Sequence, residues 1–362
     1  MKKFFLFAAV AAIGLFACKN QSEMLDATDS SVRSKAPVSK DIRYFDDYEQ
    51  LSKEIDKTAN MSFDELCKYE ASIGFNSFGK ISDLAYNEIA ENEEIYKSVE
   101  EVRDAITKYP EYLLLAKDEK EDYTLETKLE NSPYQYIVNK EQMFQVKDTL
   151  IKVLRDVEIF ASVERYELLR KLDEAEIEML AAEAQHAPAS YDCEFLYEVV
   201  KLFEPPVIFK VYMCDGVKVS VKGDAIPHVP LMSLGRGFEM KDYSDAQKNR
   251  MWLVMRLDRG WYFGVVNYDQ YYFSCKTHRK SAGTYWRKKR DVEYYFDVYV
   301  ANAIPDSHVY WKNEGVYNKW HTYDKISVEW YINTLYFQKT RGYIKAFDGV
   351  NLGFNLDLDN TY

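Results

Sequence analysis

The chain has 362 residues, enough for two domains, and carries 59 acidic against 47 basic side chains, a formal net charge of −12. This excess of acid excludes the strongly basic footprint of nucleic-acid-binding proteins, so no nucleic-acid partner is expected. Aromatic side chains make up 15% of the residues, which gives the chain ample material for a packed core.

The first 17 residues have the pattern of a secretory signal peptide. An apolar run from Phe4 to Phe16 follows two lysines and is too short to cross a bilayer, for which ~20 residues are needed. The run ends in the sequence LFAC, which resembles a bacterial lipobox. The resemblance implies cleavage before Cys18 and lipid attachment there, although Phe16 is bulkier than the residue usual at its place. The alternative is an ordinary signal peptide with a chance cysteine.

Lipid attachment to Cys18 predicts where the protein is located. Several acyl chains together hold a protein firmly at a membrane. We therefore expect a cell-envelope protein, anchored at the outer membrane through Cys18. Residues 18–40 are rich in Ser, Asp, Thr and Lys, and such a segment cannot bury enough apolar surface to offset its ordering entropy. This segment is expected to be a flexible tether.

Residues 41–186 form an acidic region, with 35 acidic and 18 basic side chains, that is predicted to be mostly helical. A helical spacing of apolar residues begins at Ile42 and continues to Ile55. Two S-x-x-E capping boxes, at Ser62 and at Ser98, predict the starts of two further helices, and Gly74 fits the end of the first of these. The stretch 162–184 predicts another helix or a helix pair.

A β-hairpin is predicted inside this acidic region. The sequence YQYIVNKEQMFQVKDTLIKVL contains two β-like runs on either side of residues 139–142, which places the expected turn there.

Three stretches resemble a family of lipoproteins of unknown function from Gram-negative gut anaerobes: SFDELCKYEASIGFNSF, DLAYNEI and YIVNKEQMFQVKDTLIKV. They cover about a fifth of the chain. The chain departs from the family pattern at Lys140-Glu141, which replaces a turn with glycine, and at Lys147, where glycine is usual before Asp148. The resemblance implies an envelope-anchored, non-catalytic protein and supplies no catalytic residues.

The composition changes near Ala187, where we predict a boundary between domains 41–186 and 187–362. Residues 187–362 hold 21 acidic and 23 basic side chains, all six tryptophans and 19 of the 30 tyrosines. The second region alternates apolar and polar residues, and its Asp215-Gly216 pair is a strong hairpin signal. Strands are predicted at 207–213, 217–221, 251–257, 292–300 and 326–332. The pattern predicts an α+β chain whose second domain is an antiparallel β-sandwich or a barrel, of which the sandwich is favoured.

Four cysteines follow Cys18, at wide and irregular spacings: Cys67, Cys193, Cys214 and Cys275. No C-x-x-C pair or matching histidine pair predicts a zinc site. Four cysteines in an exported chain allow three disulfide connectivities, and they could equally be small buried apolar residues. The sequence leaves these alternatives open.

A basic segment at residues 276–290 is the one local anomaly, with seven bases and no acid. Clustered bases attract anions, and an aromatic ring beside them offers a stacking surface. Bases on alternate residues would face both sides of a strand, so we expect an exposed edge, strand end or loop. The alternatives are a charged strand edge that prevents edge pairing, and docking onto the acidic region of the same chain. The residues predicted to bind an anionic ligand are His278, Arg279, Lys280, Trp286, Arg287, Lys288, Lys289 and Arg290.

The known catalytic motifs, including G-x-S-x-G, H-E-x-x-H and phosphate-binding loops, are absent from the sequence, and its five histidines lack ligand spacing. No catalytic residue, metal site or cofactor is therefore predicted. The favoured hypothesis is a non-catalytic binding or adhesion lipoprotein whose ligand is a glycan or an anionic envelope polymer. The alternatives are a structural partner of another envelope protein and an unrecognised glycan-processing enzyme.

Overall fold

The computed structural model describes residues 37–117, 122–155, 157–184, 193–201, 207–222, 237–244, 248–262, 265–301, 304–316, 319–327, 336–347 and 350–357. The predicted signal peptide, Cys18 and the tether up to residue 36 lie outside this set. The described residues belong to one compact unit of the chain, 36–362.

The described strands form three sheets, mostly antiparallel. The first has the order β1-β4-β5-β6-β7-β8-β9, with β1 parallel to β4. Its strands are β1 (Tyr44–Phe45), β4 (Met143–Val146), β5 (Thr149–Leu154), β6 (Val157–Ser162), β7 (Glu194–Lys201), β8 (Val207–Cys214) and β9 (Val217–Lys222).

The second sheet has the order β10-β11-β12-β13-β3-β2, and β16 also pairs with β12. Its strands are β10 (Gly237–Ser244), β11 (Asn249–Tyr262), β12 (Val265–Ser281), β13 (Thr284–Arg287), β3 (Tyr123–Thr127), β2 (Leu113–Lys117) and β16 (Lys319–Ser327). The third sheet has the order β15-β14-β17-β18, built from β15 (Ile304–Val316), β14 (Arg290–Ala301), β17 (Tyr336–Ala346) and β18 (Val350–Asp357).

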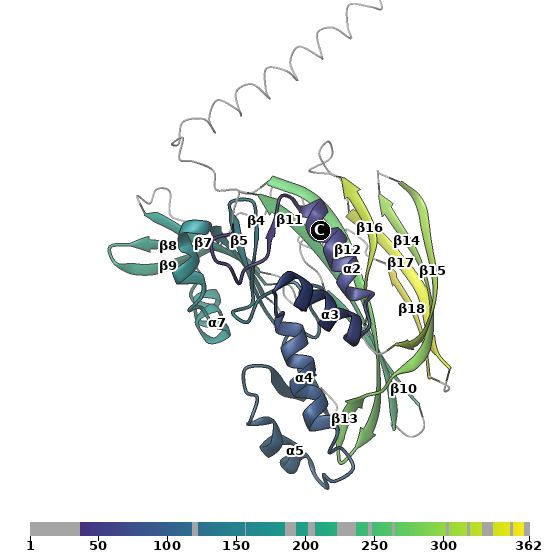
Figure 1. Ribbon diagram of the computed structural model, residues 1–362. Helices are drawn as coiled ribbons and strands as arrows, with labels where there is room; N and C mark the ends of the chain where they lie inside the picture. Colours follow the sequence, from purple (N-terminus) through teal and green to yellow (C-terminus); the bar gives the residue numbers. More distant parts are fainter. Residues whose placement is uncertain are drawn as a thin grey trace, which may run out of the picture. The chain divides into compact units, whose positions relative to one another are not determined.

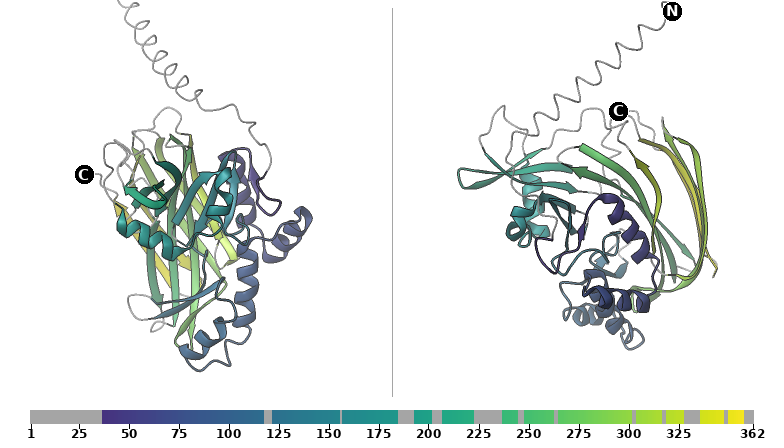
Figure 2. Two further views of the ribbon diagram at one scale, coloured as in Figure 1. Left: turned by 90° about the vertical axis from the view of Figure 1, so that its left-hand side faces the viewer. Right: turned by 45° about the horizontal axis from the view of Figure 1, so that its top comes forward.

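Six α-helices lie in the described part of the chain, all from the predicted acidic region. They are α2 (Tyr48–Ala59), α3 (Phe63–Ile73), α4 (Phe78–Ala90), α5 (Val99–Ile106), α6 (Tyr166–Leu169) and α7 (Glu174–Glu183), with a 3₁₀ turn, η1 (Val163–Arg165), before α6. Helices α2–α5 lie on one side of β12, and the third sheet lies on the other (Figures 1 and 2). The α+β class is confirmed, and the same acidic region also supplies strands β1–β6.

Local signals set the helix boundaries largely as predicted. Ser62 and Glu65 form the full capping box of α3, and Gly74 ends that helix in the left-handed conformation, with a φ of 66°. Ser98 caps α5 by accepting from the Glu101 N–H. The first helix begins later than its apolar spacing indicated, at residue 48, because Asp47 accepts from the Gln50 N–H and caps it there.

The predicted position of the hairpin turn at residues 139–142 is wrong. Residues 134–138 are turns rather than a strand, and the Val138 N–H donates to the Tyr134 carbonyl at 3.0 Å. The hairpin is formed by β4 and β5, which are joined by Lys147-Asp148. Lys147 has a φ of 51°, a region that favours glycine.

In the β-rich region the Asp215-Gly216 turn is confirmed, with φ values of 51° and 80° between β8 and β9. The predicted strands at 251–257 and 292–300 lie within β11 and β14. Most of the predicted strand at 326–332 lies outside the described residues.

The largest core cluster packs α2 between the first and second sheets. It contains Leu51 and Ile55 of α2, Phe144 of β4 and Trp252 of β11, all buried. A second cluster packs α6 and α7 against the first sheet, and a third packs α4 and α5 against β2 and β3. The boundary near Ala187 stays a prediction. The first core cluster and the parallel pairing of β3 with β13 both join residues from the two sides of it.

Candidate functional site

The basic segment forms the end of β12, a tight turn, β13 and the connection to β14. Ala282 and Gly283 make the turn, with φ values of 50° and 75°. Lys288 and Lys289 connect β13 to Arg290, the first residue of β14. The segment therefore passes from the second sheet into the third.

The predicted exposure of this segment is wrong for seven of its residues. Among these buried residues are Lys276, His278, Trp286 and Arg290. Trp286 is a core residue: it stacks on Tyr96 with ring centroids 5.9 Å apart, and its indole N–H donates to the Ser281 carbonyl at 3.1 Å. The ring is therefore not available as a stacking surface for a ligand.

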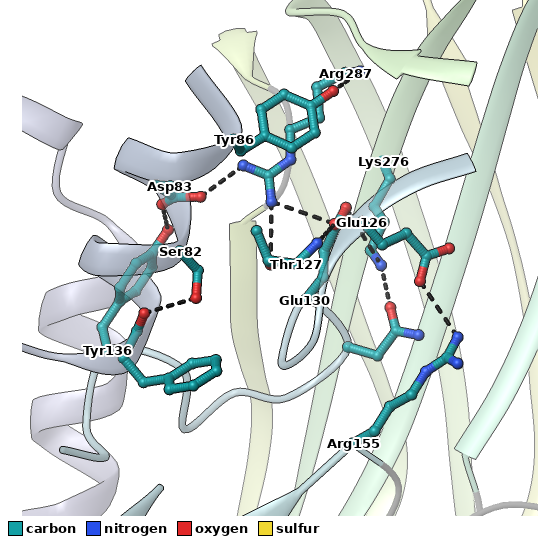
Figure 3. Close-up of polar contacts among 12 residues, drawn as sticks. Ser82, Asp83, Tyr86, Glu126, Thr127, Glu130, Tyr136, Arg155, Lys276 and Arg287 are labelled. Carbon is teal, nitrogen blue, oxygen red and sulfur yellow. Dashed lines mark hydrogen bonds and ion pairs between the residues drawn. The ribbon is translucent and has the colours of Figure 1, made fainter. Parts of the chain in front are cut away.

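Arg287 is the centre of a buried charge network that links the basic segment to the acidic region (Figure 3). Its Nη1 lies 2.6 Å from Asp83 Oδ1 of α4, and its Nη2 lies 3.2 Å from Glu130 Oε2. Its guanidinium carbon lies 4.1 Å from the centre of the Tyr86 ring, and its backbone N–H donates to the Tyr86 hydroxyl at 2.7 Å. Arg287 thus holds helix α4 and residue 130 to the end of β13.

The local sequence of α4 explains this geometry. Asp83 and Tyr86 are three residues apart and so lie on one face of the helix. Gly79 allows that face to approach residues 135–136, because a Cβ there would lie 2.6 Å from a Tyr136 ring carbon and 2.7 Å from the Gln135 carbonyl oxygen. The Tyr136 hydroxyl then donates to the second Asp83 oxygen at 2.7 Å.

Lys276 is the second cation of the network. It is fully buried and donates to the Asn131 side chain, and its Nζ lies 3.7 Å from Glu130 Oε1. Glu130 therefore lies between Arg287 and Lys276. The neighbouring Glu126 is ion-paired with Arg155 at 3.3 Å, and burial raises the pKa of Glu126 against the opposing effect of the nearby cations.

His278 is buried among cations rather than beside a base. Burial lowers the pKa of its imidazole well below the usual value, and the charges of Arg250, Lys276 and Arg287 lower it further. The ring is therefore neutral at pH 7. A neutral, buried imidazole supports packing better than proton transfer to a ligand.

The remaining bases differ in exposure. Arg279 is ion-paired with Glu93 at 2.8 Å, and Lys280 with Asp122 at 2.5 Å. Lys288 and Lys289 are exposed and form no ion pair with the described residues. Docking onto the acidic region, one of the alternatives for this segment, is thus the main role of its bases. The assignment of these residues to ligand binding stays a prediction.

Sequence reasoning missed the acidic partners of the network. Asp83 and Glu130 are 204 and 157 residues from Arg287, and neither belongs to a recognisable motif. Gly283 was an available signal for the turn between β12 and β13, because glycine readily adopts positive φ. No local signal indicated the acidic partners.

Cys193 and Cys214 form a disulfide with their Cα atoms 4.9 Å apart, one of the connectivities that the sequence left open. Cys67 and Cys275 are free thiols, and burial raises the pKa of Cys275. In the part of the chain that the structure describes, no helix is long and apolar enough to span a bilayer. Within the same ranges no group of three or more candidate side chains is placed to hold a metal ion.

Comparison with known proteins does not assign the chain to a family. No family model matches the chain, and no curated protein matches it. Among solved structures, the chain is similar to a DUF4848 family protein from Bacteroides thetaiotaomicron, at 13% identity over 87% of this chain and 96% of that chain, with a TM-score of 0.27. At that TM-score the likeness supports no argument about activity, and the resemblance to lipoproteins of gut anaerobes stays a prediction.

Proposed function

We propose that this chain is an exported lipoprotein, anchored in the outer membrane through Cys18, that binds an acidic glycan or another anionic envelope polymer without processing it. The sequence around Cys18 supports the anchor. One structural observation carries the binding role: Lys288 and Lys289 are an exposed, adjacent pair of cations on a backbone that is held on both sides.

That backbone is fixed by its neighbours. The Lys288 N–H donates to the Thr277 carbonyl at 2.8 Å, and the Thr277 hydroxyl donates back to the Lys288 carbonyl. Arg287 is held by Asp83 and Glu130, and Arg290 donates to the His278 carbonyl at 3.0 Å. The two lysines therefore present charge from a preorganised position, which reduces the ordering cost of binding.

The second and third sheets would act as the two layers of a sandwich-like body behind this pair. The edge-to-face contact of Phe273 with Tyr294, with ring centroids 5.3 Å apart, supports that arrangement, as do the contacts of β10 and β11 with β18. A rigid body of this kind suits binding better than a catalytic cycle. The neutral His278 and the ion-paired carboxylates of the network support the non-catalytic part of the proposal.

The test measures binding of the detergent-purified protein to polygalacturonate, hyaluronan and chondroitin sulfate, with neutral dextran as the comparison. Replacing Lys288 and Lys289 together by Ser should weaken binding to an acidic polymer, and wild-type binding should weaken as salt rises, because exposed charges are screened over ~8 Å at physiological ionic strength. A matched control replaces Lys171 and Lys222, two exposed lysines elsewhere, by Ser.

Equal binding by both double variants would contradict the role of Lys288 and Lys289. Retention of a stable envelope protein, with no polymer bound, would favour a structural partner instead. Release of shortened glycan would favour an enzyme.

A further inference from the structure

A second group of basic side chains lies on one face of the second sheet and shares only Lys276 with the basic segment. Lys241 of β10 and Lys276 of β12 are both directly opposite Trp252 of β11 in the strand register. Directly opposite residues point to the same face of a sheet. Arg250 lies two residues from Trp252 on the same strand and so shares that face.

Three cations surround the Trp252 ring. The Lys276 and Lys241 ammonium nitrogens lie 4.2 and 4.5 Å from its centre, and the Arg250 guanidinium carbon lies 5.3 Å away. Lys276 and Arg250 are fully buried, whereas Lys241 is half-buried. Lys241 is therefore the member of this group that a molecule in solution reaches first.

Two hydrogen-bond donors of this group, the Trp252 indole N–H and the Lys241 ammonium, have no acceptor among the described residues. The Trp252 indole N–H is buried, with 3% of the residue exposed, and it makes no hydrogen bond to the described residues. Buried donors of this kind are nearly always paired in folded proteins. The Lys241 ammonium contacts the ring face, and its side chain forms no hydrogen bond or ion pair with any described residue.

The three cations give the surroundings of the ring a positive potential, which attracts anions. An anion beside Lys241 would also supply an acceptor for the buried Trp252 N–H.

We propose that the Lys241 ammonium and the Trp252 indole N–H together bind one oxyanion, the carboxylate or sulfate group of an acidic glycan, in the field of Arg250. A carboxylate or sulfate has several acceptor oxygens, so one group can accept from both donors. The identity of the polymer rests on the proposed function, whereas the site rests on the geometry of Lys241 and Trp252. It is distinct from Lys288 and Lys289 and would fix one charged sugar unit in place.

The test follows the indole N–H resonances of the full-length protein, labelled with ¹⁵N in its six tryptophans, by NMR. Trp252→Phe removes the indole N–H, keeps an aromatic ring and identifies the resonance. The wild type is titrated with sodium sulfate at constant ionic strength, balanced with sodium chloride, and separately with tetragalacturonate. The Trp252 resonance should shift and saturate.

Lys241→Met should weaken sulfate binding at least tenfold, while Lys222→Met, which removes an exposed charge outside both proposed sites, should leave it unchanged. If Trp252→Phe does not fold, the test still holds: one of the six resonances must saturate in the wild type and must fail to do so in Lys241→Met. A Trp252 resonance that does not move, a shift that grows linearly without saturation, or equal weakening by Lys222→Met would overturn the site.

The two proposals fail separately. Sulfate binding at Trp252 by a protein that binds no acidic polymer supports the site and contradicts the proposed function. Polymer binding that Lys241→Met leaves unchanged contradicts the site and leaves the proposed function in place.

Discussion

Replacing Arg287 by Met tests whether the buried network joins the acidic region to the second sheet. Methionine keeps much of the side-chain volume over Tyr86 but removes the charge, and it leaves Asp83 and Glu130 without their shared partner. The side chains of Arg287, Asp83 and Glu130 are only 14%, 11% and 1% exposed, so solvent screens their pairing weakly. Breaking a buried ion pair at one partner costs roughly 3–5 kcal/mol.

We therefore expect Arg287→Met to lower the free energy of unfolding by about 4 kcal/mol. This is a large fraction of the ~5–15 kcal/mol that keeps a typical protein folded. At about 2 °C per kcal/mol for a chain of this length, the melting temperature should fall by about 8 °C. Urea unfolding, followed by far-UV circular dichroism, measures the loss of stability from the shift in midpoint.

Two further variants separate the charge effect from lost packing. Adding Asp83→Asn to Arg287→Met removes one of the two carboxylate charges that lost their shared partner, and it keeps an acceptor for the Tyr136 hydroxyl. The double variant should therefore be more stable than Arg287→Met alone. Lys289→Met removes an exposed charge and should change stability by roughly 0.5 kcal/mol or less. A loss of less than about 1 kcal/mol for Arg287→Met, or no rescue by Asp83→Asn, would refute the reasoning.

Four other predictions concern the anchor, a turn, a buried amine and the domain boundary. Cys18→Ala should move the protein from the membrane fraction to the soluble fraction, and a variant still membrane-bound after a high-salt wash would contradict the anchor. Lys147→Gly should raise the free energy of unfolding by up to about 1 kcal/mol, because the φ of 51° is strained for lysine; a loss on urea unfolding would contradict this. Burial lowers the pKa of Lys152 to about 8 in the folded chain, from 10.5 in the unfolded chain. Between these two values the unfolded chain binds more protons, so the contribution of Lys152 to stability should rise from about pH 8 towards pH 10.5. The wild-type protein should gain stability over this range relative to Lys152→Met, and a constant difference between the two would argue against the shift. Limited proteolysis should remove residues 18–40 first and cut next at residues 186–192. The two large fragments should co-elute on gel filtration, because β3 pairs with β13 across the boundary; early cuts inside residues 290–335 would argue for a different division.

Local signals in the sequence correctly predicted the helix caps and turns that depend only on neighbouring residues. The capping box at Ser62 and the Asp215-Gly216 turn each require only residues within a few positions, and both are present. The hairpin at Lys147 was misplaced because its left-handed residue is a lysine, which does not mark a turn as glycine does.

The network around Arg287 could not be predicted in the same way. A run of bases on successive residues indicates exposure only if no distant acid is available to pair with them. Here the partner acids are Asp83 of α4 and Glu130 of the turn after β3. They lie so far from Arg287 in the sequence that no spacing rule links them to it. The Lys241–Trp252 group depends on the register of β10, β11 and β12, which the sequence alone does not fix.

The most direct test of the proposed non-catalytic binding role is equilibrium binding of the detergent-purified wild-type protein to polygalacturonate, with product analysis in the same wells. A non-catalytic binding protein should show saturable binding that weakens as salt rises, with the polymer length unchanged after prolonged incubation. Shortened polymer, or the absence of saturable binding to polygalacturonate, hyaluronan and chondroitin sulfate alike, would contradict it.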